Sequence, residues 1–331
     1  MTARPIAVTM GEPAGVGFEI TLKAWAAAQQ GGSTTPFVLL GDCNAAAATA
    51  AALGLPAPCP VDLIAETPDA FRHGLPVLHQ PLTAPVVSGT PDPRNAPAVT
   101  GAIADGVRRV QAGEASALVT NPIQKETLAA AGFPHPGHTE YLAELTGGEA
   151  VMMLAVPGLR VVPATIHVPL ARVPLLLTTD GLVRQGRILA RSLAADFGIT
   201  QPRIAVAGLN PHAGEGGMLG PEEQAIIAPA IAILRSDGIE AFGPLPADTL
   251  FHAEARTRFD AALCMYHDQA LIPLKTIDLW GGVNVTLGLP VVRTSPDHGT
   301  ALDIAGRGIA RPDSLIAAIA MAQTIAARRA A

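Results

Sequence analysis

Three histidines follow short apolar segments at corresponding positions, and together they could bind a catalytic metal. His167 follows LRVVPATI, His212 comes just after RIAVAGLN, and His267 comes just after AALCM. Each segment reads as a buried strand, so the three imidazoles would lie at strand ends that face one crevice. Catalytic metal sites use such separated ligands, whereas structural zinc sites use close pairs rich in cysteine. A lone histidine would be read as a hydrogen-bonded loop residue, but three in equivalent positions favour a metal site.

A predicted helix start could bind a small anion. His138 and Thr139 stand at this start in PHPGHTEYLAELTGG, with Glu140 in the first turn. Free backbone N–H groups beside a histidine and a hydroxyl suit a phosphate or a carboxylate. The same residues also fit an ordinary N-terminal cap by Thr139, with Glu140 favoured by the helix dipole. This segment alone leaves both interpretations open.

The segment after MYHDQ supplies further groups for an anion. Lys275, Asn284 and Arg293 occur among short apolar segments in a chain of which only 15% of residues are charged. Arginine offers a planar fork and lysine a point charge, which are the two usual partners of phosphate. The alternative is that Arg293 pairs locally with Asp297 and that Lys275 is solvated.

The glycine-rich segment TMGEPAGVGFEI, residues 9–20, predicts a strand that turns into a helix. Gly15 and Gly17 would let an anion approach the backbone at the helix start, but an ordinary turn would look the same. The segment lacks both the GxGxxG spacing of the common dinucleotide fingerprint and the GK[ST] ending of a phosphate loop. No standard motif in this segment therefore indicates nucleotide binding.

Short apolar segments rich in β-branched residues recur along the chain and predict strands: IAVTM, FVLLG, ALVT, VMMLAVP, LRVVPATI, RIAVAGLN and AALCMY. Stretches with helical spacing occur between several of them, such as Ala45–Leu53, Leu182–Phe197 and Pro221–Leu234. Strands without polar alternation are typical of largely parallel sheets covered by helices on both faces, so the predicted class is α/β. Residues 81–100, dense in Pro, Thr and Gly, predict a long surface loop and a candidate lobe boundary.

Length and composition exclude several classes of protein. At 331 residues the chain exceeds the usual size of one hydrophobic core, so two lobes, or one large α/β unit split by a cleft, are expected. A formal net charge of -6 and the absence of a basic arm argue against nucleic-acid binding. The three cysteines, Cys43, Cys59 and Cys264, form no CxxC pair, which favours a reducing cytoplasm. No segment is long and apolar enough for a signal peptide or a membrane span.

Taken together, these segments resemble the 4-hydroxythreonine-4-phosphate dehydrogenase family over nearly the whole chain. The motifs that carry the resemblance, in family order and spacing, are MGEPAGVG, TNPIQKETL, GHTEYL, GLNPHAGEGG, GPLPADTLF, MYHDQALIPLK, GVNVTLGLP and RTSPDHGTALDIAG. Departures are small. Phe18 stands where the family often has proline, and Trp280 with Gly281 lies where the family varies.

The resemblance implies two α/β/α lobes separated by a cleft, as in isocitrate and isopropylmalate dehydrogenases. Residues 1–130 with 290–331 are expected to form the first lobe and residues 131–289 the second. The implied metal ligands are His167, His212 and His267, in a site shared between the subunits of a homodimer. The implied substrate contacts, carried over motif by motif, are His138, Thr139, Lys275, Asn284 and Arg293.

The reaction implied by the resemblance is the NAD- or NADP-dependent oxidation of 4-phosphooxy-L-threonine in vitamin B6 synthesis. Its product, 2-amino-3-oxo-4-phosphooxybutanoate, then loses carbon dioxide to give 3-amino-2-oxopropyl phosphate. A divalent zinc, magnesium or cobalt ion on three imidazoles would acidify the substrate hydroxyl. Lys275, Asp248 and a metal-bound water all remain candidates for the base. Some relatives act on phosphorylated threonate or erythronate, and others act on an aromatic dihydrodiol. The motif GPLPADTLF resembles the vitamin B6 branch more than these, and phosphorylated threonate or erythronate remains the alternative substrate.

Two other enzyme classes and a non-catalytic role remain open. A metal-dependent hydrolase would need a carboxylate base, for which Glu215 or Asp268 could serve. Transfer of an acyl group to phosphate is also possible, because phosphotransacetylases share a related architecture. A binding module without catalysis would leave a complete set of ligands without a purpose. Production of reduced nicotinamide distinguishes a dehydrogenase from all three.

Overall fold

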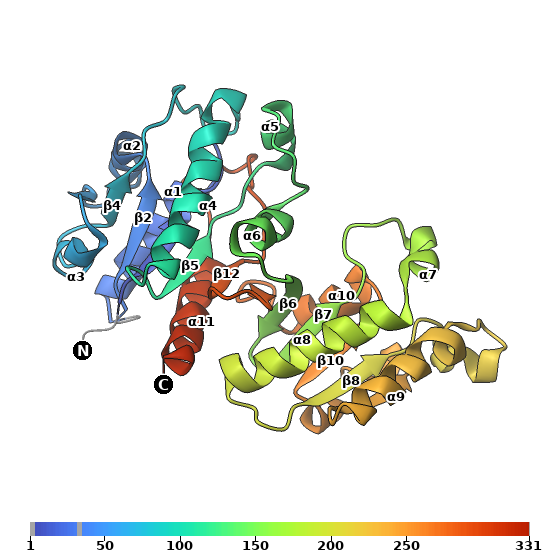
Figure 1. The fold of residues 1–331 in the computed structure, drawn as a ribbon. Helices are drawn as coiled ribbons and strands as arrows, with labels where there is room; N and C mark the ends of the chain where they lie inside the picture. The colour runs from blue at the N-terminus through green and yellow to red at the C-terminus, as the bar shows by residue number, and fades with distance from the viewer. Residues whose placement is uncertain (1–3, 32–34, 331) are drawn as a thin grey trace. The chain divides into compact units, whose positions relative to one another are not determined.

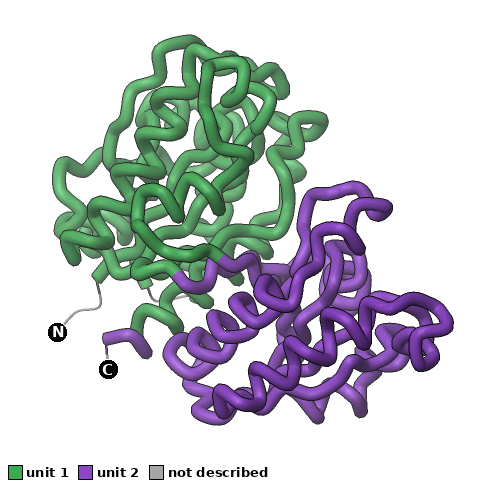
Figure 2. Tube along the Cα trace, turned by 45° about the vertical axis from the view of Figure 1, so that its right-hand side comes forward, with its two compact units in different colours: residues 1–150, 289–327 green, residues 151–288, 328–331 purple. Residues whose placement is uncertain are grey.

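The computed structural model describes residues 4–31 and 35–330, which divide into two compact units. Unit 1 comprises residues 1–150 and 289–327, and unit 2 comprises residues 151–288 and 328–331, shown in green and purple in Figure 2. The division differs from the expected lobes mainly in residues 131–150, which belong to unit 1. These residues stay with unit 1 because Phe133 packs against the core formed by Ala96, Val99 and Leu128.

Unit 1 contains a parallel sheet with strand order β3-β4-β2-β1-β5-β12. The strands are β1 Ile6–Thr9, β2 Phe37–Gly41, β3 Cys59–Val61, β4 Pro76–His79, β5 Ala117–Thr120 and β12 Arg293–Pro296. All residues of β1, β2 and β5 are buried, which explains why their sequences lack polar alternation. Parallel strands place their carboxyl ends at one edge, and the polar residues of this unit follow that edge.

Helices connect and cover these strands (Figure 1). They are α1 Gly17–Gln29, α2 Cys43–Leu53, α3 Thr67–Ala70, α4 Ala96–Gln111, α5 Lys125–Ala130, α6 His138–Thr146 and α11 Asp313–Arg329. Local sequence signals set the ends of these helices, as α2 shows. At its start, the Asp42 carboxylate accepts hydrogen bonds from the N–H groups of Asn44 and Ala45. At its end, Gly54 adopts a left-handed conformation with φ 65°.

Unit 2 contains a mixed sheet with strand order β11-β6-β7-β10-β8-β9. The strands are β6 Val151–Val156, β7 Leu159–Pro163, β8 Arg203–Ala207, β9 Glu240–Leu245, β10 Ala261–Cys264 and β11 Val283–Leu287. β6 pairs antiparallel with β11 and β7, whereas β7, β10, β8 and β9 run parallel. The helices are α7 Val173–Leu176, α8 Thr179–Phe197, α9 Ala228–Ser236 and α10 His267–Ile277.

The α/β class and each predicted strand are confirmed. The predicted helix Pro221–Leu234 is interrupted, because a π-turn at Glu223–Ile227 precedes α9. Pro229 lacks the N–H group that a continuous α-helix would need at this point. The predicted loop 81–100 ends earlier than expected, since α4 begins at Ala96, and both of its flanks lie in unit 1. No helix in the described part of the chain is long and apolar enough to cross a membrane.

Candidate active site

The three histidines follow neighbouring parallel strands of unit 2. β10 lies between β7 and β8 in the sheet, and His167, His267 and His212 come after β7, β10 and β8 respectively. The ring centroids of His167 and His267 are 5.7 Å apart. The order of these strands, which sequence patterns do not reveal, therefore brings two of the three predicted ligands together at one sheet edge.

Backbone and side-chain hydrogen bonds hold the loops after these strands together. The Ala164 N–H donates to the Cys264 carbonyl at 2.7 Å, and the Thr165 hydroxyl donates to the Met265 carbonyl at 2.8 Å. The buried Gln269 side chain accepts from the Met265 N–H and donates to the Gly208 carbonyl, both at 2.7 Å. Gln269 thus ties the loop after β10 to the loop after β8. The sequence analysis assigned it no role.

His267 begins α10, and its orientation favours a free Nε2 lone pair. Its Nδ1 lies 2.7 Å from Asp268 Oδ1. A carboxylate can only accept here, so Nδ1 carries the proton and Nε2 remains available to a metal. Carboxylate–histidine pairs of this kind are a recurring feature of metal sites. The same contact engages one oxygen of Asp268, the residue considered above as a hydrolase base.

His212 lies in an unusual turn. Residues 212–216 all have positive φ, including the non-glycine residues His212, Ala213 and Glu215 at 51°, 49° and 46°. This left-handed region is costly for side chains other than glycine, and such strain concentrates at functional sites. A Cβ on Gly214 would lie 2.5 Å from Glu223 Oε2, so this position requires glycine.

Glu223 organises the base of this turn. Its Oε1 accepts the N–H groups of Leu209 and Asn210 at 2.7 and 2.8 Å, and its Oε2 accepts the Asn210 side-chain amide at 3.0 Å. Burial raises the pKa of Glu223, but the hydrogen bonds from Asn210 and Leu209 outweigh it and lower the pKa overall. The carboxylate is therefore ionised at neutral pH and fixes the start of the loop that carries His212.

Within residues 4–31 and 35–330, no three His, Cys, Asp or Glu side chains come close enough together to hold a metal ion. His167 and His212 are exposed and His267 is half-buried. The close pair is His167 with His267, and His212 lies outside it.

Unit 1 contains a second group of predicted residues, at the start of α6 and at β12. Arg293 is 2% exposed, and its Nε and Nη2 donate to Thr120 Oγ1 at 3.1 and 2.5 Å, at the end of the neighbouring strand β5. His138 and Thr139 occupy the first turn of α6. The N-cap is Gly137 and no side chain caps the helix, so the interpretation of Thr139 as the cap is wrong. The N–H groups of this turn therefore remain available to a ligand.

The electrostatics of this group favour an anion. Burial lowers the pKa of Arg293 to about 9, so its guanidinium remains charged at neutral pH. Burial, followed by the charges of Arg293 and Lys125, holds the pKa of His138 well below its usual value. The Nε2 atom of His138 is enclosed without a hydrogen-bond partner among the described residues. A neutral imidazole, a charged guanidinium and a helix N-terminus together suit a phosphate or a carboxylate.

The other two predicted substrate residues lie in unit 2. Lys275 is in the last turn of α10, and Asn284 is in β11 opposite Leu154 of β6. The Oδ1 atom of Asn284 is enclosed without a hydrogen-bond partner among the described residues. An enclosed acceptor of this kind is costly unless a ligand or a water molecule satisfies it.

The chain matches the family model described as "Pyridoxal phosphate biosynthetic protein PdxA" over residues 33–322. It is 55% identical to a protein from Caulobacter vibrioides named 4-hydroxythreonine-4-phosphate dehydrogenase, with 99% of each chain covered. The chain belongs to the PdxA family. A crystal structure of 4-hydroxythreonine-4-phosphate dehydrogenase from Klebsiella pneumoniae is 38% identical, with a TM-score of 0.87 and coverage of 98% of this chain and 100% of that one. The terephthalate dihydrodiol dehydrogenase of Burkholderia xenovorans is 28% identical, with a TM-score of 0.64 and coverage of 97% and 98%.

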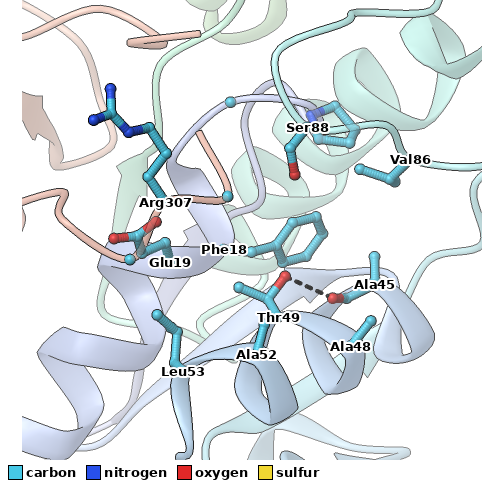
Figure 3. Close-up of a pocket in the computed structure, with 14 residues that line it drawn as sticks. Phe18, Glu19, Ala45, Ala48, Thr49, Ala52, Leu53, Val86, Ser88 and Arg307 are labelled. Carbon is cyan, nitrogen blue, oxygen red and sulfur yellow. Dashed lines mark hydrogen bonds between the residues drawn. The ribbon is translucent and has the colours of Figure 1, made fainter. Parts of the chain in front are cut away.

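As a member of the PdxA family the chain needs a place for a nicotinamide cofactor, and unit 1 contains a cavity of about 280 Å³ (Figure 3). Its walls follow the carboxyl ends of β1, β2, β4 and β12. α2 contributes one face of mostly small side chains, at spacing i, i+3, i+4, i+7 and i+8: Ala45, Ala48, Thr49, Ala52 and Leu53. Phe18, Ser88 and Arg307 also line it, the last two with polar groups.

The loop at the rim of this cavity is held in place by α1. Lys23 Nζ donates to the carbonyls of Gly308 and Ala310 at 2.9 and 2.7 Å, and it forms an ion pair with Glu19 at 2.7 Å. Glu19 in turn accepts the Ala310 N–H at 2.8 Å. The cavity therefore has fixed walls formed by two helices and two loops. The sequence analysis did not locate it, because no nucleotide fingerprint marks it.

Proposed function

We propose that this protein oxidises the C3 hydroxyl of 4-phosphooxy-L-threonine with NAD or NADP, in the synthesis of the vitamin B6 cofactor. The printed names of its relatives support this activity. The observation that best supports a phosphorylated substrate is the buried group of Arg293, His138 and the start of α6. The product is a β-keto acid, 2-amino-3-oxo-4-phosphooxybutanoate, which loses carbon dioxide to give 3-amino-2-oxopropyl phosphate.

His167, His267 and His212 would hold a divalent zinc, magnesium or cobalt ion. The fit rests on the close pair of imidazoles and on the Asp268 contact that leaves Nε2 of His267 free. A bound divalent ion supplies Lewis acidity, which lowers the pKa of a substrate hydroxyl and stabilises the oxygen that becomes the ketone. Asp268 and Gln269 act through His267, since they orient its ring and its loop.

We infer that the active protein is a homodimer and that His212 reaches the site from a second copy of the chain. Two observations support this: His167 and His267 form a pair within one chain, and the described residues contain no complete group of three ligands. The exposure of His167 and His212 leaves their imidazoles accessible to another chain.

The substrate-binding residues would orient the reacting carbon. Arg293, His138 and Thr139 hold one anionic group of the substrate at the start of α6, and Lys275 and Asn284 complete the contacts. Binding energy from these remote contacts would orient the reacting C3 carbon, and a nicotinamide, when bound, would accept the C3 hydrogen as hydride while the hydroxyl proton is released. The free thiols Cys43, Cys59 and Cys264 fit a protein of the reducing cytoplasm.

We also propose that the cavity of unit 1 takes the adenosine part of the cofactor. Its volume of about 280 Å³ fits part of a dinucleotide, and the small side chains of α2 leave a flat apolar wall for a planar base. Replacing Ala48 by phenylalanine would fill this space, so the KM for NAD(P) is expected to rise about tenfold or more. The KM for the phosphorylated substrate should remain unchanged in the same assays.

The matched control for this variant is Ala51→Phe, because Ala51 is an exposed residue of α2 that does not line the cavity. Equal cofactor KM values for Ala48→Phe, Ala51→Phe and the wild type would reject the cavity as the cofactor site. That result would leave the proposed reaction intact.

The function is tested by nicotinamide reduction with 4-phosphooxy-L-threonine, before and after removal of metal by a chelator. We expect reduction that disappears on chelation and returns when zinc, magnesium or cobalt is added. Reduction with 4-phosphorylated threonate or erythronate but not with 4-phosphooxy-L-threonine would change the substrate assignment. Failure to reduce the cofactor with any of these would reject a dehydrogenase and direct attention to hydrolysis or acyl transfer.

A further inference from the structure

Lysine is rare in this chain, which contains Lys23, Lys125 and Lys275 among 22 lysine and arginine residues. Lys23 anchors the loop at the rim of the cavity through two carbonyls and Glu19. Lys275 belongs to the proposed substrate contacts. Lys125 alone has no assigned role.

The position of Lys125 is unfavourable for helix stability. It is the first residue of α5, where unpaired N–H groups give the helix end a partial positive charge and a cation is disfavoured. No hydrogen bond or ion pair joins its ammonium group to another described residue. Neither helix capping nor a salt bridge explains this lysine.

Lys125 instead lies against the start of α6. A Cβ built on Gly137, the N-cap of α6, would be 3.5 Å from Cε and 3.7 Å from Nζ of Lys125. The next residue is His138, whose Nε2 is enclosed without a hydrogen-bond partner among the described residues. Glu140 Oε2 would be 3.6 Å from the same Cβ, but no ion pair joins Glu140 to Lys125.

Positive charge therefore gathers here around a point where an anion can bind. Burial first, and then the charges of Arg293 and Lys125, lower the pKa of His138 and hold its imidazole in the neutral form. Two cations and the positive end of α6 repel one another, and a bound anion would remove this repulsion. The exposure of Lys125 leaves its flexible side chain free to approach such a ligand.

We propose that Lys125 is a further substrate-binding residue, whose ammonium contacts the anionic group that Arg293 and His138 hold. This inference rests on the proposed function, because it adds a second cation beside Arg293 to the same anion site. The anionic group is an oxyanion, either the phosphate or the carboxylate of the substrate. The two sources can be separated by the choice of inhibitor.

The experiment compares wild type, Lys125→Met, Lys125→Arg and the control Arg72→Met, all as metal-loaded full-length chains. Methionine keeps the unbranched side chain up to the ε position and removes the charged nitrogen. Arg72 is an exposed cation of unit 1 with a 68% exposed side chain. Steady-state kinetics would give KM for 4-phosphooxy-L-threonine and for the cofactor. Inhibition constants for inorganic phosphate and for L-threonine would be measured alongside, with the rise in Tm that each causes.

We expect Lys125→Met to raise the substrate KM by roughly tenfold, through the loss of a charge-assisted contact, while the cofactor KM and the Tm without ligand stay unchanged. Lys125→Arg should restore most of the affinity, and Arg72→Met should behave as wild type. A weaker effect of inorganic phosphate alone would assign Lys125 to the phosphate, and a weaker effect of L-threonine alone would assign it to the carboxylate.

Unchanged substrate KM and inhibition constants in Lys125→Met would overturn the inference. A fall in Tm without ligand, with no change in substrate affinity, would also overturn it by assigning a structural role. Neither result would affect the proposed function, which fails only if the wild type does not reduce the cofactor.

Discussion

Replacing His267 by alanine is expected to lower the rate of nicotinamide reduction by at least ~100-fold, because loss of a residue that merely supports a ligand already costs 10–100-fold. The imidazole of His267 is the one whose Nε2 is left free by the contact with Asp268. Metal content measured on the purified protein should fall in parallel with activity. His252→Ala is the matched control, since His252 is an exposed histidine of the same unit whose Nδ1 accepts the Ala255 N–H of its own turn.

The proposed sharing of the site between two chains gives this substitution a second, more specific expected outcome. His212→Ala and His267→Ala should each be inactive alone. In a mixed dimer, one site would combine His267 of one chain with His212 of the other and would be intact, whereas the second site would lack both. Random exchange of equal amounts should therefore restore about a quarter of the wild-type activity, since half of the dimers are mixed and half of their sites are complete.

Mixing that restores nothing, although subunit exchange is shown by a mass-tagged chain, would place all three histidines of a site in one chain. Full activity of His267→Ala with normal metal content would remove His267 from the ligand set. These two results can be told apart, so the metal proposal and the dimer proposal are tested separately.

The histidine pair shows what could be predicted from the sequence and what could not. Each histidine was predicted to follow a strand because apolar, β-branched segments of four to eight residues are local signals. The contact between His167 and His267 depends on β10 pairing with β7, which joins segments about a hundred residues apart. No local pattern carries that information. Gln269 was missed for the same reason, because its partners become visible only when β8 and β10 are neighbours.

The turn around His212 was predicted in composition but not in conformation. The density of glycine in GLNPHAGEGG indicated a close backbone approach, yet the positive φ of His212, Ala213 and Glu215 is unfavourable for these residue types. The turn is held by Glu223, which lies in the segment predicted as a continuous helix. Glu223 begins the π-turn Glu223–Ile227, and its carboxylate reaches back to the N–H groups of Leu209 and Asn210. Local helix propensity predicts neither the π-turn nor this contact.

Arg293→Met is expected to lower kcat/KM for 4-phosphooxy-L-threonine by at least ~100-fold. Each hydrogen bond to a charged group contributes about 1.5–3 kcal/mol, and the guanidinium can form two such bonds with one oxyanion. Inorganic phosphate should also cease to raise the Tm. Arg293→Lys should recover only part of the activity, since a lysine keeps the charge but not the planar fork.

The same substitution should leave the fold as stable as the wild type or more stable. Burial lowers the pKa of Arg293 from its usual value to about 9, so the unfolded chain binds this proton more tightly than the folded chain does. The unfavourable contribution of the buried charge is complete below about pH 9 and declines as the pH rises through the pKa of the folded chain towards the higher pKa of the unfolded chain. At neutral pH methionine removes this contribution, at the cost of the two hydrogen bonds that Nε and Nη2 donate to Thr120.

Urea unfolding at neutral pH decides between the two roles of Arg293. We expect a free energy of unfolding within about 1 kcal/mol of the wild type, or above it, together with the loss of activity. A large loss of stability would mean that the bonds to Thr120 hold β12 against β5, and the loss of activity would then say nothing about substrate binding. If stability is kept, a buried guanidinium that the fold does not need is best explained by the anion it binds.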